Sequence, residues 1–75
     1  MSDYQLMTLV IKAQEDARRC YRIYLRYVRD WETAKRLKAD KFDERVARGD
    51  VVVWQNRSHA ANAHAIGMMR IYLMR

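Results

Sequence analysis

Apolar residues recur at alternating steps of three and four along the first half of the chain, and this spacing constrains the fold more than any other feature. The stripe consists of Leu6, Val10, Ala13, Ala17, Cys20, Tyr24, Tyr27, Trp31 and Ala34. Residues spaced in this way lie on one face of an α-helix or along the seam of a coiled coil. Ser2 or Asp3 can cap the start, and the stripe stays in register to about Leu37. The sequence therefore predicts one long helix over residues 3 to 38.

The segment ARGDVVVW, residues 47 to 54, contains the glycine best suited to a turn. Gly49 fits the left-handed position that closes a helix, and Asp50 fits the N-cap of the next one. We therefore expect a turn at residues 49 and 50, and we expect Gly49→Val to damage folding by forcing a β-branched residue towards positive φ. The apolar register slips after Leu37, so residues 40 to 48 either form a short helix or continue the first one.

A second helix is predicted over residues 51 to 75, because the chain has no proline and is rich in alanine, methionine and leucine here. Its inward face is predicted to comprise Val51, Trp54, Ser58, Ala61, Ala65, Met68 and Tyr72. Folding this helix back from a turn at 49 and 50 would bring Ala61 and Ala65 close to Leu37 and Ala34. The predicted fold is an all-α helical hairpin that forms one domain over residues 1 to 75.

A second helix of this length would leave the N-terminal half of the first helix uncovered. Each large apolar side chain left in water would forgo roughly 1.5–3 kcal/mol of burial free energy. We therefore expect a homodimer, built as an antiparallel bundle of four helices. The residues expected at its interface are Leu6, Leu9, Val10, Ala13, Ala17, Cys20 and Tyr24.

Positive charge points to an anionic partner. The chain has 15 Lys and Arg against 9 Asp and Glu, which gives a net charge of +6. At 100° per residue, five arginines fall within about 80° of one another on a helix. This arginine ridge consists of Arg18, Arg22, Arg26, Arg29 and Arg36. Such a row can contact the carboxylates of an acidic protein surface or the phosphates of a nucleic acid, or it can be an ordinary solvated face.

Two further groups of residues are candidates for contacts. Tyr21, Tyr24 and Tyr27 could stack on nucleic-acid bases, but the spacing favours packing in the seam. The C-terminal segment AIGMMRIYLMR is apolar on more than one side. Its residues Ile71, Leu73 and Met74 are expected to anchor a partner protein, with dimer contacts or a membrane surface as alternatives.

The sequence contains no pattern typical of an enzyme or a metalloprotein. His59 and His64 are five residues apart, about 140° around a helix, whereas shared metal ligation favours spacings of three or four. Cys20 has no second cysteine with which to pair. We expect no cofactor and no catalytic activity. No secretion signal and no apolar run of about 20 residues is present, so we expect a cytoplasmic protein without a membrane span.

These features favour a small non-enzymatic regulator, inhibitor or adaptor. It would bind another protein and occlude its surface, using the arginine ridge and the apolar C-terminal residues. The alternative is a nucleic-acid-binding protein that places the same ridge on phosphates. No helix-turn-helix, zinc finger or aromatic RNA-binding signature accompanies the ridge.

Overall fold

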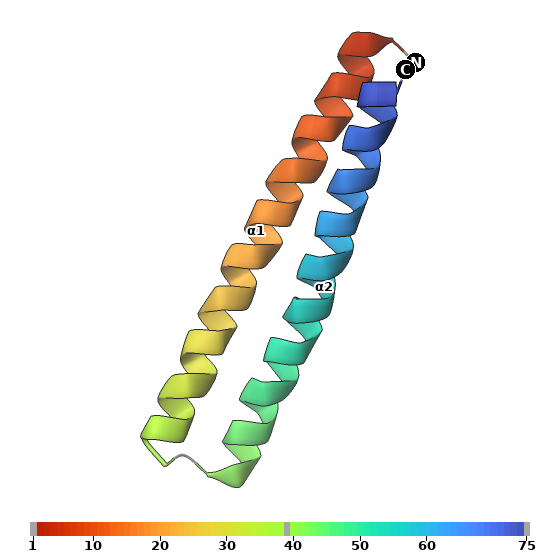
Figure 1. Ribbon diagram of the computed structural model, residues 1–75. Coiled ribbons are helices and arrows are strands. Elements are labelled where there is room, and N and C mark those ends of the chain that lie inside the picture. Colours follow the sequence, from red (N-terminus) through yellow and green to blue (C-terminus); the bar gives the residue numbers. More distant parts are fainter. Residues whose placement is uncertain (1, 39, 75) are drawn as a thin grey trace.

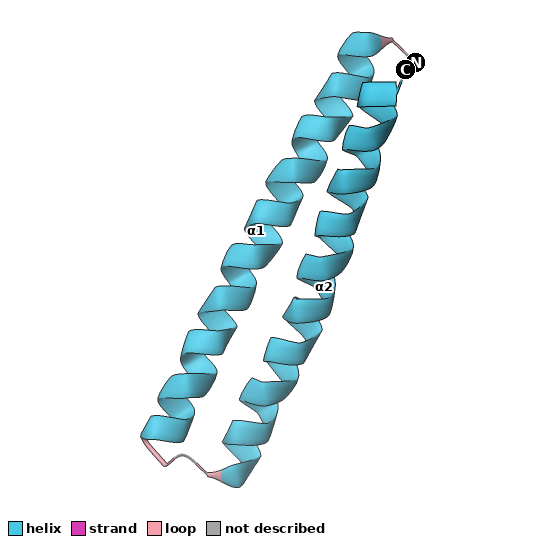
Figure 2. Ribbon diagram, viewed as in Figure 1, coloured by secondary structure: helices cyan, strands magenta, loops and turns pink. Residues whose placement is uncertain are grey.

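The chain, described here by a computed structural model, is a hairpin of two long antiparallel helices that lie side by side (Figure 1). Residues 2–38 and 40–74 are described. Helix α1 spans Asp3–Arg36 and helix α2 spans Lys41–Met74, and no strand occurs within the described residues (Figure 2). The molecule measures 54 × 14 × 13 Å, and the start of α1 lies beside the end of α2. The predicted all-α helical hairpin is confirmed.

Helix α1 begins at a capping box. The backbone N–H of Gln5 donates to Oγ of Ser2 at 3.2 Å, and the backbone N–H of Ser2 donates to Oε1 of Gln5 at 3.0 Å. These two bonds satisfy backbone donors that the first turn of a helix leaves unpaired. Asp3 in the first turn and Lys35 and Arg36 in the last turn also complement the helix dipole. Of the two predicted caps, Ser2 is therefore the one used.

The chain reverses at residues 37 to 40, so the predicted turn at Gly49 and Asp50 is wrong. Leu37 and Lys38 donate backbone N–H groups to the carbonyls of Thr33 and Lys35, and Lys38 has a φ of 52°. Helix α2 begins directly after Asp40 and continues through Gly49, which has no positive φ. Residues 41 to 48 thus belong to the second helix, and residue 75 of the predicted helix lies outside the described residues.

The two predicted inward faces form the seam between the helices. Val10 and Ala13 of α1 are buried, and the other members of the first stripe are half-buried. On α2 every residue of the predicted face is buried or half-buried, and the face continues back to Ala47 and Glu44. The spacing identified these residues correctly because it depends only on the period of the helix.

The register between the two helices differs from the predicted one. Tyr27 stacks on Trp54 with ring centroids 6.1 Å apart and an interplanar angle of 16°. Ala65 lies level with Ala17, beside the same hollow, and not with Ala34 or Leu37. The predicted pairing of Ala61 and Ala65 was wrong because it assumed a turn at residue 49.

Helix α2 covers the N-terminal half of α1, so the surface predicted for dimerisation is already used within the chain. Val10 and Ala13 are buried in the seam, and Leu6, Ala17, Cys20 and Tyr24 are half-buried there. Only Leu9 of this group is exposed, at 40%. The predicted interface is therefore incorrect, because both helices have 34 residues and match in length.

Gly49→Ala is expected to stabilise the protein by about 0.5–1 kcal/mol, because glycine within a helix costs about that much relative to alanine. The position has helical φ, and an added Cβ would meet nothing within 4 Å. Urea unfolding followed by circular dichroism measures the change, with Gly67→Ala as a second helical glycine that also has open space for a Cβ. A loss of stability in Gly49→Ala would contradict the continuous α2.

Candidate anion-binding surface on the first helix

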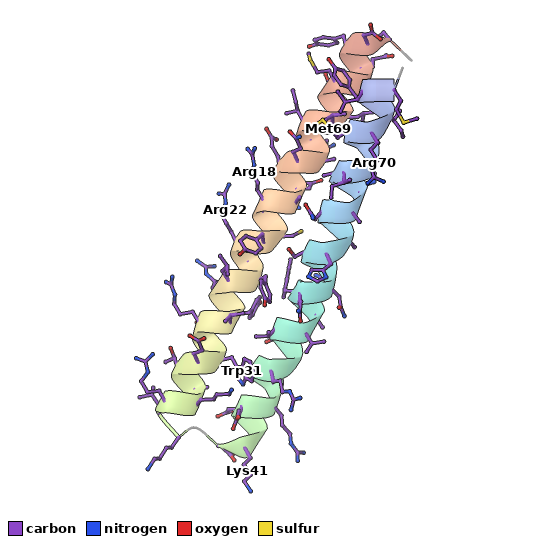
Figure 3. All side chains as sticks on the ribbon, in the orientation of Figure 1. Arg18, Arg22, Trp31, Lys41, Met69 and Arg70 are labelled. Atoms are coloured by element: carbon purple, nitrogen blue, oxygen red, sulfur yellow. The ribbon has the colours of Figure 1, made fainter. Side chains whose placement is uncertain are left out.

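The arginine ridge lies on the side of α1 that faces away from α2. All five of its side chains are exposed, and Figure 3 shows Arg18 and Arg22 extending away from α2. This placement follows from the seam, because Ala17 and Tyr24 turn the opposite side of the helix towards α2. From residue 18 to residue 36 the ridge is about 27 Å long. It presents a row of guanidinium groups to the surroundings.

The ridge arginines form no close ion pairs with carboxylates of the described residues. Nη2 of Arg19, which is not a ridge residue, lies 3.7 Å from Oδ1 of Asp16, and both side chains are largely exposed. Such a surface pair contributes little to stability. No ridge arginine forms an ion pair with any residue that the structure describes. All five guanidinium groups are therefore available to an external anion.

The centre of the ridge borders a hollow on the outer side of α1. Arg19, Arg22, Ile23 and Arg26 line it. These residues are three, four and seven positions apart, so their side chains are neighbours on the helix surface. Three guanidinium groups around one aliphatic side chain can accept a carboxylate together with its apolar stem. Arg19 was not predicted as a member of this hollow, although its i, i+3 and i, i+7 spacing to Arg22 and Arg26 is visible in the sequence.

Two other cations are held against tryptophan rings beside the seam. Nζ of Lys35 lies 3.7 Å from the centroid of the Trp31 ring, and Cζ of Arg57 lies 4.8 Å from that of Trp54. These contacts are favourable cation–π interactions. Lys35 and Arg57 therefore contribute to packing, which distinguishes them from the ridge arginines.

The three tyrosines near the ridge have different environments. Tyr24 and Tyr27 are half-buried in the seam, as expected. Tyr21 is 53% exposed, and its ring centroid lies 6.1 Å from that of Tyr24. The prediction that Tyr21 packs in the core was wrong, because its position lies about 60° around the helix from Tyr24, which faces α2.

A groove runs along one side of the hairpin, next to the seam. Two adjoining hollows share Ala17, Arg18 and Asn62. Tyr21 and His59 lie towards the turn, and Ile66 and Met69 lie towards the termini. This groove could not be predicted from the sequence, because its two walls come from different helices and their pairing depends on the register.

The apolar C-terminal residues are separated from the ridge. Ile71, Leu73 and Met74 are all exposed on the last turn of α2. The antiparallel arrangement places the C-terminal end of α2 beside the start of α1. The ridge begins at Arg18 and continues towards the opposite end of the hairpin, where the chain reverses (Figure 1). The structure thus does not bring these predicted partner contacts together with the ridge into one surface.

Residues with catalytic or metal-binding chemistry do not cluster in the described parts of the chain. Within residues 2–38 and 40–74, no three His, Cys, Asp or Glu side chains are grouped as a metal site requires. His59 and His64 are exposed on α2, and Cys20 is a half-buried free thiol.

No protein family, curated protein or solved structure matches the chain. In the ranges that the structure describes, neither helix is apolar enough over a sufficient length to cross a lipid bilayer. What the protein binds is therefore inferred from the arrangement of its own residues.

Proposed function

We propose that the protein is a small non-enzymatic regulator, inhibitor or adaptor of the cytoplasm that occludes an acidic surface of another protein. The observation that carries this proposal is the row of five exposed ridge arginines without an ion pair among the described residues. Guanidinium groups bind carboxylates through two parallel hydrogen bonds, and arginine is enriched at protein interfaces for this reason.

The hollow beside the ridge favours a protein partner over a simple polyanion. It combines Arg19, Arg22 and Arg26 with the aliphatic side chain of Ile23. Aspartate and glutamate present a carboxylate on a short aliphatic stem, so they fit both parts of the hollow. Ile71, Leu73 and Met74 would add apolar contacts only for a partner that also reaches the end of the hairpin.

Nucleic-acid binding is the second candidate function. The ridge is straight and about 27 Å long, and a row of this kind can also follow a phosphate backbone. Tyr21, exposed beside Arg18, offers a ring on which a base could stack. The two functions differ in which anion the ridge prefers.

Reversing the charge at the centre of the ridge is expected to abolish its preference for anions. We expect Arg22→Glu/Arg26→Glu to bind a labelled polyglutamate of about 50 residues roughly 100-fold more weakly than the unchanged protein, because two attractive contacts become repulsive. Fluorescence anisotropy from 50 to 300 mM salt measures the affinity, in parallel with a labelled DNA duplex of about 30 base pairs.

Lys41→Glu/Arg45→Glu is the matched control, since it changes the net charge equally at exposed positions of α2. The affinity of this control variant for polyglutamate should decrease much less than that of Arg22→Glu/Arg26→Glu. Tighter binding of the duplex, with a log–log salt slope of about −4.5 for five phosphate contacts, would favour the nucleic-acid function. Absence of binding to either probe at 50 mM salt would contradict an anion-binding role for the ridge.

A further inference from the structure

The hairpin exposes more surface than a compact protein of its size. Its accessible surface is 6248 Å², whereas a compact monomer of 9.1 kDa exposes about 4,900 Å². The excess of about 1,350 Å² is larger than the roughly 800 Å² that each partner contributes to a standard interface. Among the described residues no side chain is completely enclosed. Two helices alone therefore leave enough surface uncovered for a stable interface.

Half of the exposed large apolar side chains among the described residues lie on the side of the hairpin that contains the groove, which we call the groove face. On α1 the groove face extends in steps of three and four to Met7 at one end and Glu32 at the other. On α2 it extends in the same steps to Leu73 and Arg48. It includes seven of the large apolar side chains that are exposed, namely Met7, Ile11, Tyr21, Leu25, Val52, Ile66 and Leu73.

The two helices carry matching residues at several levels of the groove face. Tyr27 stacks on Trp54, and Ala17 and Ala65 border the same hollow, so residues whose numbers add up to about 80 lie level. Apolar residues are thus level near both ends, in the pairs Met7 with Leu73, Ile11 with Met69, and Val28 with Val52.

Polar residues occupy the middle of the groove face. Arg18 lies level with Asn62, and Tyr21 lies level with His59. At the end nearest the turn, Glu32 lies level with Arg48, and neither of them forms an ion pair among the described residues. The groove face therefore joins apolar residues at three levels and opposite charges at one level, whereas Gln14 lies level with Ile66 and Leu25 lies level with Gln55.

We propose that a second copy of this chain covers the groove face, with its turn at the same end and its α2 lying against α1 of the first copy. A two-fold axis along the hairpin then brings each level of one copy to the same level of the other. Met7 meets Leu73 of the second copy, Val28 meets Val52, and Glu32 meets Arg48, so apolar groups pack together and opposite charges are adjacent.

Charge disfavours the arrangement in which the second copy is turned end for end. If the two groove faces are centred on each other, that arrangement places α1 of one copy against α1 of the other. Arg18 of each copy would lie close to Arg18 of the other, and Glu32 would no longer lie beside Arg48. Like charges across an interface are unfavourable, so the arrangement with both turns at one end is preferred.

The proposed dimer keeps the predicted homodimer but uses a different surface, and it does not depend on the proposed function. The ridge residues Arg22 and Arg26 lie about 40° and 80° around α1 from Arg18, on the side away from the groove. The dimer would therefore cover Arg18 but leave Arg22 and Arg26 of each copy exposed, on opposite sides of a four-helix bundle.

Val52 and Val53 provide a matched pair of substitutions. They are adjacent and 48% and 46% exposed, but only Val52 lies on the groove face. By light scattering between 1 and 100 μM, we expect twice the 9.1 kDa chain mass for the unchanged protein and for Val53→Lys. Val52→Lys should dissociate at least about 100-fold more readily, since it buries a charge between apolar groups. A 9.1 kDa particle at 100 μM, or equal effects of the two substitutions, would overturn the proposal.

Exchanging charges tests the arrangement even if Val52→Lys does not fold. Glu32→Arg and Arg48→Glu should each weaken self-association roughly 10-fold, because each creates two like-charge contacts in a homodimer. Mixed together, the two variants should form a heterodimer at nearly the original affinity, because both contacts between the copies again join opposite charges. Native mass spectrometry resolves the heterodimer from the two homodimers, because the three species differ in mass. Without a preference for the heterodimer, the proposed arrangement is incorrect.

Discussion

Trp54→Ala is expected to lower the free energy of unfolding by about 3 kcal/mol, the low end of the range for removing a buried tryptophan. Trp54 is half-buried in the seam, where its ring stacks on Tyr27 and contacts the guanidinium of Arg57. The rest of the α2 seam in this region is small, with Ser58 and Ala61 as the next members. The next seam residues of α2 are therefore too small to fill the space that the ring would leave.

Urea unfolding followed by circular dichroism measures this change at one fixed chain concentration, since association adds to apparent stability. Trp54→Phe is the control, because a phenyl ring keeps most of the contact with Tyr27, and we expect it to cost about 1 kcal/mol. The double variant Tyr27→Ala/Trp54→Ala should show a coupling of about 0.5–1.5 kcal/mol. A loss below 1 kcal/mol for Trp54→Ala would contradict the observed register.

The seam could be predicted from the sequence because helical periodicity is a local property. Val10 and Ala13 on α1, and Val51 and Ala65 on α2, were assigned to inward faces without knowing where the chain reverses. The same applies to the exposed ridge, whose arginines share one side of α1 whatever packs against the other side. Even three consecutive valines, which favour a strand by propensity, were correctly read as helical from their alanine-rich and methionine-rich context.

The position of the turn could not be predicted, because the backbone free-energy costs of the two possible turns are small and similar. Glycine within a helix costs about 1 kcal/mol, and a residue such as Lys38 at positive φ costs about as much. Packing between the helices along their whole length therefore decides which of the two turns forms. A turn at residues 37 to 40 gives two helices of 34 residues, so Leu6, Val10 and Ala13 are covered. The turn at Gly49 would have left them in water.

The groove face was missed for the same reason. Met7, Ile11 and Leu25 repeat at helical spacing beside the seam, and this second stripe was visible in the sequence. Its counterpart on α2 could be matched to it only once the register was known. An error of about ten residues in the turn shifts the pairing by about twice that number, so Arg48 could not be placed beside Glu32.

Val51→Asp is expected to unfold the protein, with a loss of at least about 3 kcal/mol, because a carboxylate would be buried in the seam without a partner. Val51, Val52 and Val53 are chemically identical neighbours, yet Val51 is only 7% exposed while the other two are nearly half-exposed. Val53→Asp is therefore the matched control, and it should cost less than about 1 kcal/mol at a surface position.

Circular dichroism at 25 °C distinguishes these outcomes directly. The Val51→Asp chain should lose most of its helical signal, because a hairpin with so few buried side chains has little stability in reserve. The Val53→Asp chain should keep its signal. An equal loss of helical signal in both variants would mean that α2 is rotated about its axis relative to the seam described above. Loss in Val53→Asp alone would place that residue, rather than Val51, against α1. Either result would also invalidate the groove face, since the seam at Val51 fixes the side of α2 on which Val52 and Arg48 lie.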